Sequence, residues 1–196
     1  MHTEIFLREF APLASGPGGI QNLRNMVLQL AVRGKLVRQI ADEGDAQELL
    51  SELKLCFKKQ NSKAEYPNTT PLFEIPTTWQ WTTMAGIGRI VGGGTPKSNV
   101  SEYYSEPGVP WLTPADLYGF TEKLISRGKR SISELGLAES SARLLPEGSV
   151  LFSSRAPIGY SAIAANPLAT NQGFKSCVPF VEGMSEFILI YLRASI

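Results

Sequence analysis

The sequence predicts an α+β fold, in which a β-rich domain with irregular loops follows N-terminal helices. Apolar residues recur at helical spacing through most of the first sixty positions, and short apolar runs separated by Gly, Pro, Asn and Asp follow them. The last residues return to an apolar pattern that is typical of a helix. A length of 196 residues with 43% hydrophobic residues is enough to bury a sizeable core.

The first predicted helix follows a glycine-rich hinge at residues 15–19. A short apolar stretch precedes the hinge, at Ile5, Phe6, Leu7, Phe10 and Leu13. Gly34 is expected to end the helix. Apolar residues on one face indicate the helix itself, namely Ile20, Leu23, Val27, Leu30 and Ala31.

The second predicted helix begins at Asp45, because Glu48 three residues later completes a capping-box pattern. Its apolar residues again cover one side, at Leu49, Leu50, Leu53, Cys56 and Phe57. Two short helices cannot close a core alone. We therefore expect their apolar faces to pack on the rest of the chain, on each other or on a partner.

Residues 58–71 are polar and contain two prolines, which is typical of a linker, so we place a domain boundary between residues 64 and 65. The segment 131–144 predicts the one helix inside the β-rich part. The predicted strands are 86–91, 109–112, 149–152, 161–164 and 175–180.

The tail of the chain is apolar nearly all round and predicts a helix that begins at a Ser185 cap. The apolar positions are Phe187, Ile188, Leu189, Ile190, Tyr191, Leu192 and Ile196. A helix that stops without a C-cap at its most apolar stretch usually continues or is covered by something else. We therefore expect the 196 residues to be the front part of a longer polypeptide.

Composition excludes several classes of protein. The balance of 19 basic and 18 acidic residues gives a net charge of +1, so any contact with nucleic acid requires a local basic patch. Two distant cysteines and a single histidine, His2, provide no zinc site. No apolar stretch approaches the roughly 20 residues of a membrane span, and we expect a cytoplasmic protein without a membrane partner.

Cofactor sites and catalysis are not expected either. The segment 92–98 lacks the glycine that a phosphate-binding loop needs before its lysine, because Pro96, which has no amide hydrogen, precedes Lys97. The glycines at 86–92 miss the dinucleotide-binding spacing by one residue. No nucleophile–histidine pair and no paired carboxylate motif is present. The sequence therefore predicts no cofactor and no enzyme activity of its own.

Four cations lie within eight residues, at Lys123, Arg127, Lys129 and Arg130, beside the single acidic Glu122. Such a patch could contact DNA phosphates, or it could be an ordinary solvated loop. The two interpretations stay open.

Three further loops carry side chains that can contact DNA. Arg155, with Ser154 before it, follows a predicted buried strand and could make a bidentate contact to guanine or to a phosphate. The amides of Asn171 and Gln172 could pair with an adenine edge, or they could bond the neighbouring backbone and set a turn. Lys175 would then contact the DNA backbone.

The third loop contains Gly93, Gly94, Thr95 and Lys97. Its glycines allow either close approach to a ligand or a hairpin or bulge with positive φ. The chain also has aromatic residues that could stack on bases but are more often expected in the core, namely Trp79, Trp81, Trp111 and Phe174. The candidate DNA-binding residues are Gly93, Gly94, Thr95, Lys97, Lys123, Arg127, Lys129, Arg130, Ser154, Arg155, Asn171, Gln172 and Lys175.

Residues 30–36 read Leu-Ala-Val-Arg-Gly-Lys-Leu, and the segment Asp-Ala-Gln-Glu-Leu-Leu begins at residue 45. This N-terminal part of the chain resembles the conserved N-terminal segment of the specificity (S) subunits of type I restriction-modification systems. In that family a Leu-Ala-Val-x-Gly-Lys-Leu phrase recurs, and residues 30–36 contain it here. Other phrases are similar to the family's later landmarks, in the same order, at residues 74–81, 93–96, 109–112, 145–151 and 171–173.

The resemblance implies a protein that catalyses nothing itself. Each of two target recognition domains in a full S subunit reads one half of a split duplex DNA site. Its conserved helices recruit modification (methyltransferase) subunits, and restriction subunits add the nuclease. This chain would contain a conserved helical segment at 1–64, one recognition domain at 65–184 and the truncated start of the central helix at 185–196, so it would read a single half-site.

The helices are expected to bind partners. Their apolar residues would pack as the start of a stalk and would bind a modification subunit or a second copy of the chain, through Leu23, Val27, Leu30, Phe187, Ile190 and Tyr191. The alternative is an interaction module that has lost specific DNA binding. Basic side chains consumed in internal salt bridges would favour this alternative, and basic side chains lining one face with the glycine-rich loop would favour DNA binding.

Overall fold

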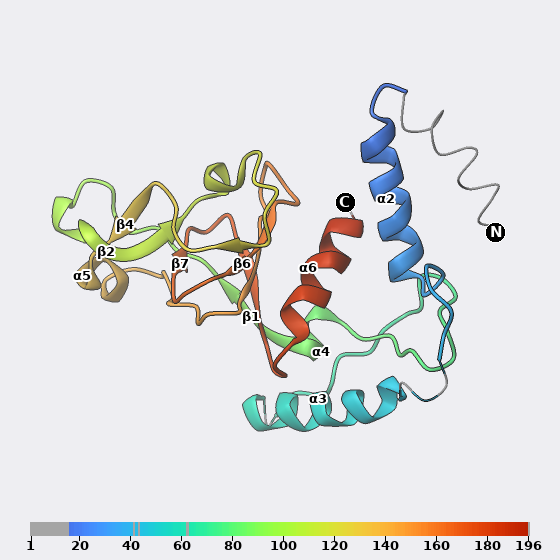
Figure 1. The fold of residues 1–196 in the computed structure, drawn as a ribbon. Coiled ribbons are helices and arrows are strands. Elements are labelled where there is room, and N and C mark those ends of the chain that lie inside the picture. Colours follow the sequence, from blue (N-terminus) through green and yellow to red (C-terminus); the bar gives the residue numbers. More distant parts are fainter. Residues whose placement is uncertain (1–15, 41, 43, 62, 196) are drawn as a thin grey trace.

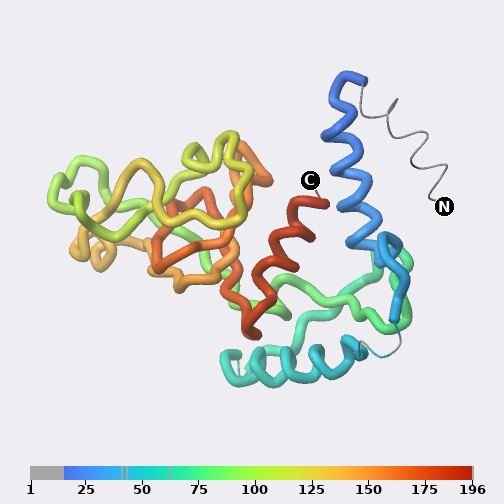
Figure 2. Tube along the Cα trace, in the orientation of Figure 1, coloured from blue at the N-terminus to red at the C-terminus, as the bar shows by residue number. Residues whose placement is uncertain are grey.

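The computed structural model describes residues 16–40, 42, 44–61 and 63–195, so the predicted apolar start, Ser15 of the hinge and Ile196 lie outside the described residues. Figure 1 shows a β-rich body beside a group of helices, and the same separation is visible in the trace of Figure 2. The expected mixture of helices and sheets is confirmed. The helices are α2 (Gly19–Val32), α3 (Ala46–Gln60), α4 (Met84–Ile87), α5 (Glu134–Ala138) and α6 (Met184–Ala194), with 3-10 turns η2 (Ser101–Tyr103) and η3 (Pro114–Leu117).

The strands form two sheets. The larger sheet has the order β1-β8-β5-β6-β3, in which only the β6–β3 pair is parallel. The smaller sheet has the order β4-β2-β7, with a parallel β2–β7 pair. The strands are β1 (Gly88–Gly92), β2 (Tyr104–Leu112), β3 (Leu124–Ile125), β4 (Arg130–Ile132), β5 (Val150–Phe152), β6 (Ser161–Ala164), β7 (Ala169–Thr170) and β8 (Lys175–Pro179).

Helices α3 and α6 share a hydrophobic core with the larger sheet. Leu53 of α3 and Ile188 of α6 are almost completely buried together with Val150 of β5 and Cys177 of β8. Burial of this kind stabilises by roughly 1.5–3 kcal/mol for each large apolar side chain. The apolar face of α3 is therefore covered by the β-rich body, which is one of the alternatives that its sequence left open.

The end of α2 explains the glycine in the Leu-Ala-Val-x-Gly-Lys-Leu phrase. Gly34 has a φ of +65°, and its N–H donates to the carbonyl of Ala31 at 3.0 Å, while the N–H of Lys35 reaches Leu30 at 2.8 Å. These two bonds make a Schellman motif. A Cβ at Gly34 would also lie 2.6 Å from Cδ of Pro76, so the chain beyond the helix packs directly on this turn.

Helix α6 lies between the β-rich body and α2 (Figure 1). The side chain of Gln29 on α2 donates to the carbonyl of Ala194 on α6. On the other side, the guanidinium of Arg193 donates to three carbonyls of the body, those of Thr121 (3.3 Å), Glu122 (2.6 Å) and Ser161 (3.1 Å). Burial, and then the positive charge of Arg24 on α2, lower the pKa of Arg193.

Several sequence predictions about elements are wrong in detail. The segment 131–144 is a strand followed by a five-residue helix, and the predicted linker begins inside α3, which continues to Gln60. Gly86 and Ile87 belong to α4 rather than to a strand. The N-cap of α6 is Gly183, because Ser185 donates instead to the carbonyl of Gly148 at 2.6 Å.

The C-terminal end of α6 also differs from the expected uncapped end. The N–H of Ser195 donates to the carbonyl of Leu192, and its hydroxyl donates to the carbonyl of Tyr191. Other predictions are confirmed: Asp45 caps α3 by accepting from the N–H of Gln47 at 2.8 Å, and the strand 161–164 matches β6.

Candidate nucleic-acid interface

The glycine-rich loop packs closely against its own chain. A Cβ at Gly93 would overlap the carbonyl oxygen of Asn171, and a Cβ at Gly94 would overlap the amide nitrogen of Ala142. Neither glycine has a positive φ, so the predicted turn with positive φ is not found here. The close approach that these glycines allow is to the backbone of the chain itself.

The loop is tied to the turn that contains Asn171 and Gln172. The N–H of Gly94 donates to the carbonyl of Thr170 at 2.8 Å, and the hydroxyl of Thr95 donates to Oε1 of Gln172. Oδ1 of Asn171 accepts from the N–H of Gly173 at 2.9 Å, which favours the turn-setting interpretation for this amide. Gln172 is exposed and belongs to the surface.

The loop that carries Arg155 joins the same turn. The N–H of Ser154 donates to the carbonyl of Gly173 at 2.8 Å, and Oγ of Ser154 lies 3.3 Å from the same oxygen. A hollow of about 510 Å³ lies between the two loops and the η3 turn, and we call it the Arg155 hollow. Its lining is Thr113, Pro114, Ala115, Tyr118, Arg155, Ala156, Pro157, Tyr160, Asn171, Gln172 and Gly173.

Sequence reasoning missed two residues in this hollow, Tyr118 and Tyr160. Their rings meet edge to face with centroids 6.5 Å apart, and Tyr118 is 81% exposed. The exposure of Tyr118 could have been predicted from the sequence only if residues 115–118 had been recognised as a turn. Exposed aromatic faces of this kind can stack on bases.

Two of the four clustered cations are engaged with carboxylates. Nζ of Lys123 lies 2.6 Å from Glu186 of α6, and Arg127 lies 3.3 Å from Glu106 of β2. All four side chains are more than half exposed, so each pair contributes little to stability. The structure thus places Lys123 against the helices and not beside the glycine-rich loop.

Lys129 and Arg130 are positioned differently. The N–H of Lys129 donates to Oδ1 of Asp116 at 2.9 Å, and Oδ2 of Asp116 accepts from the N–H of Thr113 at 2.7 Å, so one carboxylate joins the 128–129 segment to the η3 turn. The guanidinium of Arg130 lies 4.3 Å from the ring centroid of Tyr104, where a cation–π interaction is favourable.

Arg130 is also connected to the glycine-rich loop. Its guanidinium lies 5.6 Å from the ring of Trp111, whose Nε1 donates to the carbonyl of Gly94 at 2.9 Å. Lys97 and Lys175 are exposed, and neither forms an ion pair with another described residue. Contacts therefore connect Arg130, the glycine-rich loop, Gln172 and the loop that carries Arg155, whereas Lys123 and Arg127 bind other partners.

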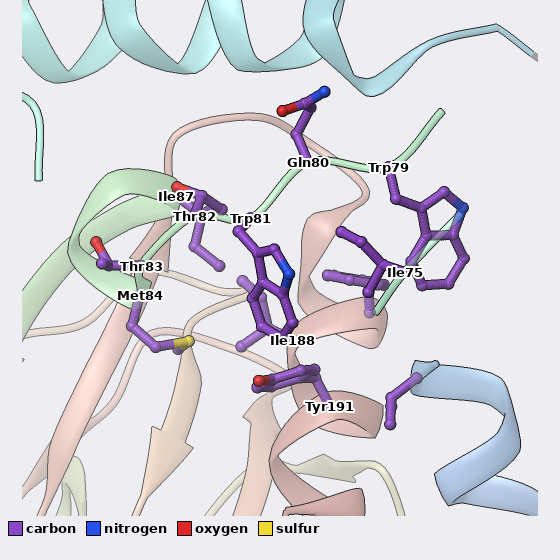
Figure 3. A pocket seen from close by; sticks show the side chains of 12 residues that line it. Ile75, Trp79, Gln80, Trp81, Thr82, Thr83, Met84, Ile87, Ile188 and Tyr191 are labelled. Atoms are coloured by element: carbon purple, nitrogen blue, oxygen red, sulfur yellow. The ribbon is translucent and has the colours of Figure 1, made fainter. Parts of the chain in front are cut away.

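The core prediction for aromatic residues is confirmed at Trp111 and Phe174, which are 3% and 0% exposed. Trp79 and Trp81 instead line a second pocket of about 260 Å³. Figure 3 shows that the Trp81 indole lies close to Tyr191 and Ile188 of α6. This pocket differs from the Arg155 hollow in that no charged side chain is among the residues that line it.

The predicted partner-binding residues divide by burial. Leu23 is buried, and Leu30 and Tyr191 are partly buried. Val27 is 40%, Phe187 52% and Ile190 40% exposed, so α2 and α6 present an apolar surface that the described residues leave uncovered.

Within the described ranges, no three His, Cys, Asp or Glu side chains are grouped as metal ligands would be. Burial raises the pKa of the Cys177 thiol to about 11, so this sulfur stays protonated at neutral pH. In the described part of the chain no helix has the length and apolar character needed to cross a membrane.

The family model and the curated relatives that match this chain agree on one family. Residues 76–196 match the family model described as the type I restriction modification DNA specificity domain. The type I restriction enzyme MjaIX specificity subunit of Methanocaldococcus jannaschii is 44% identical over 119 residues, which cover 61% of this chain and 27% of that protein. The type I restriction enzyme EcoR124I/EcoR124II specificity subunit of Escherichia coli is 30% identical over 165 residues, or 81% of this chain and 39% of that protein.

A solved structure is also similar. The HsdS subunit from Thermoanaerobacter tengcongensis aligns with a TM-score of 0.48 and 21% identity, over 88% of this chain and 39% of that one. The chain spans 27% and 39% of the lengths of the two curated relatives above. The sequence-based expectation of a non-enzyme agrees with these relatives, which are named as specificity subunits.

Proposed function

Since this chain belongs to the family of type I restriction-modification DNA specificity domains, we propose that it recognises one half of a bipartite duplex DNA target. The observation that carries the proposal is the convergence of separate loops. Hydrogen bonds join the glycine-rich loop, the 171–175 turn and the Arg155 loop into one surface around the Arg155 hollow. A surface assembled from several connections is suited to reading base edges, while neighbouring cations hold the phosphates.

The residues of this surface have different roles in DNA binding. Lys97, Lys129, Arg130 and Lys175 supply phosphate contacts, and Arg155 and Gln172 reach base edges. Gly93 and Gly94 serve this surface indirectly, because they let the loop pack against residues 142 and 171 and so hold Thr95 beside Gln172. Lys123 and Arg127 take part only if their exposed ion pairs open.

The recognition domain comprises residues 65–184 in this proposal, after a helical segment at 1–64 and before the central helix that starts at 185. A single domain holds a single half-site. With about four phosphate contacts and no second domain, its affinity for DNA approaches the non-specific range of roughly 10⁻⁴–10⁻⁶ M at physiological salt.

The partners proposed for the helices are modification and restriction subunits. The exposed apolar side chains of Val27, Phe187 and Ile190 support a protein contact, because such a patch is costly to leave in water. A second copy of the chain could cover the same patch. The chain itself supplies no catalysis, which lies in partner subunits.

A second candidate function has one observation in its favour. Lys123 and Arg127 are engaged in ion pairs within the chain, which is what an interaction module without specific DNA binding would show. Both pairs are largely exposed, however, and Arg155, Lys97 and Lys175 carry no such pair among the described residues. DNA recognition is therefore the better supported function.

The proposal is tested by fluorescence anisotropy with a labelled random duplex of about 30 base pairs at two salt concentrations. We expect saturable binding that tightens as salt is lowered, because released counterions drive phosphate contacts. No binding at any salt concentration, together with retained binding to a modification subunit, would instead support the interaction module.

A further inference from the structure

The acceptor atoms around the Arg155 hollow are largely engaged by the chain itself. Oδ1 of Asn171 accepts from the N–H of Gly173, and Oε1 of Gln172 accepts from the hydroxyl of Thr95. The backbone follows the same pattern. The carbonyl of Gly173 accepts from Ser154, and the carbonyl of Pro157 accepts from Oγ of Ser153 at 2.8 Å.

The donor groups of the same hollow are not engaged in this way. The guanidinium of Arg155 and Nε2 of Gln172 are on exposed residues, and neither has a hydrogen-bond partner among the residues that the structure describes. The bond from Thr95 is made to Oε1 of Gln172, so the NH₂ group is the end of this amide that is left for a ligand. Apart from hydroxyl groups, which can donate or accept, the free side-chain groups that line the hollow are therefore donors.

From this imbalance we infer that the Arg155 hollow reads a guanine by its major-groove edge, an inference that rests on the proposed function. Guanine presents two acceptors there, O6 and N7. Adenine presents the acceptor N7 beside a donor amino group, and cytosine presents a donor amino group. An Arg side chain can bind both guanine acceptors at once. The bidentate contact of Gln172 with adenine that its residue type suggests would require Oε1 to accept a second hydrogen bond besides the one from Thr95.

A phosphate is also rich in acceptors, but the shape of the hollow favours a base. Pro114, Pro157 and Tyr160 line the hollow together with Arg155 and Gln172, so a flat base can lie against apolar side chains that a phosphate would not use. The cations suited to phosphates, such as Lys97 and Lys175, are exposed and do not line the hollow. Gln172 is therefore a specificity-determining residue, positioned by Thr95.

The test is selection of a preferred half-site from a random duplex library with the whole chain at low salt. We expect an enriched sequence containing one guanine whose preference falls about 5- to 150-fold in Arg155→Ala, the range for removal of one bidentate base contact. In the matched control Lys97→Ala, affinity falls for all sequences, and the selected sequence stays the same. An enriched sequence that Arg155→Ala leaves unchanged overturns the inference.

Two further measurements separate a base from a phosphate and test the role of Thr95. Replacing the selected guanine by 7-deazaguanine, which lacks the N7 acceptor, should weaken binding to the wild type but not to Arg155→Ala. If instead a methylphosphonate at the same step weakens binding to the wild type but not to Arg155→Ala, Arg155 binds a phosphate and the inference is overturned. Thr95→Val should raise tolerance for adenine at this position, because the freed amide of Gln172 can turn.

The outcomes also distinguish this inference from the proposed function. If no sequence is enriched by any form of the protein, the proposed function itself fails and the guanine inference fails with it. If a sequence is enriched without a guanine that depends on Arg155, only the guanine inference fails.

Discussion

The backbone N–H of Ser154 donates a 2.8 Å hydrogen bond to the carbonyl oxygen of Gly173. This bond holds the residue before Arg155 against the residue after Gln172, although the two segments are separated along the chain by two strands. The bond therefore holds together the two backbone segments that carry the donors of the Arg155 hollow. Because the two backbone segments are already joined, DNA binding needs to order only the side chains that they carry.

Asp116 should be needed for the shape of the DNA-binding surface. Its carboxylate accepts from the N–H and hydroxyl of Thr113 and from the N–H of Lys129. Asp116→Ala leaves these donors without their partner, and removal of a hydrogen bond to a charged group costs about 1.5–3 kcal/mol. We expect a lower urea midpoint and faster hydrogen exchange at the Lys129 amide. Glu122→Ala, which removes an exposed carboxylate nearby, is the control, and equal exchange rates in both variants would contradict the prediction.

Gly34→Ala should destabilise the chain by more than the strain of its backbone alone. The residue has a φ of +65°, and the new Cβ would meet Cδ of Pro76 at 2.6 Å. Gly18 has a similar φ of +71° with no atom within 4 Å, so Gly18→Ala measures the backbone strain by itself. Strain of this kind is of order 1–3 kcal/mol. Urea unfolding should show a larger destabilisation for Gly34→Ala, and equal effects would remove the role assigned to Pro76.

Arg193 should attach α6 to the β-rich body. Arg193→Ala removes donors to three carbonyls, those of residues 121, 122 and 161, and should lower the free energy of unfolding by about 1–3 kcal/mol. Arg193→Lys should restore only part of this stability, because one ammonium cannot reach all three acceptors in the same planar arrangement. Full recovery with lysine, measured by urea denaturation, would show that charge alone matters.

Stability should fall between pH 9 and about 11 because of Cys177. Burial raises the pKa of its thiol from 9.0 to about 11 in the folded protein. Below pH 9 both the folded and the unfolded state keep the proton, so the contribution is fully present. As pH rises further the unfolded state loses the proton first, and stability falls by up to about 3 kcal/mol. Urea unfolding across this range should show a shallower decline in Cys177→Ala than in Cys56→Ala, and identical slopes would exclude Cys177 as the cause.

The fold was predictable where local signals and burial agree. The helix that starts at Asp45 has both a side-chain cap and an apolar face, and the strand 161–164 is buried on both sides and flanked by turn residues. The prediction of a helix over residues 131–144 was wrong because Leu135 and Leu137 belong to an apolar pattern that also fits a longer helix. Tertiary pairing with β2 overrides that pattern at residues 130–132, where Ile132 is completely buried.

The candidate site was predictable only as a set of residue types. Arg155 and Gln172 could be proposed from loops that follow strands, but the hydrogen bond between Thr95 and Gln172 joins residues far apart in the sequence and has no local signal. The same limit applies to charge. Nothing near Lys123 in the sequence indicates that Glu186, on a helix beyond the last strand, neutralises it.

The central claim is that DNA binds the surface formed by the Arg155 hollow and the neighbouring cations. The most direct measurement is anisotropy of a labelled duplex with the triple variant Lys129→Ala, Arg130→Ala and Arg155→Ala, against the matched triple variant Lys58→Ala, Lys59→Ala and Lys63→Ala. Both variants remove three positive charges from exposed positions. We expect the first variant to bind far more weakly, with a salt slope reduced by about one for each phosphate that is no longer bound, while the second binds as the wild type does. Undiminished binding by the first variant, or equal weakening in both, would contradict the claim.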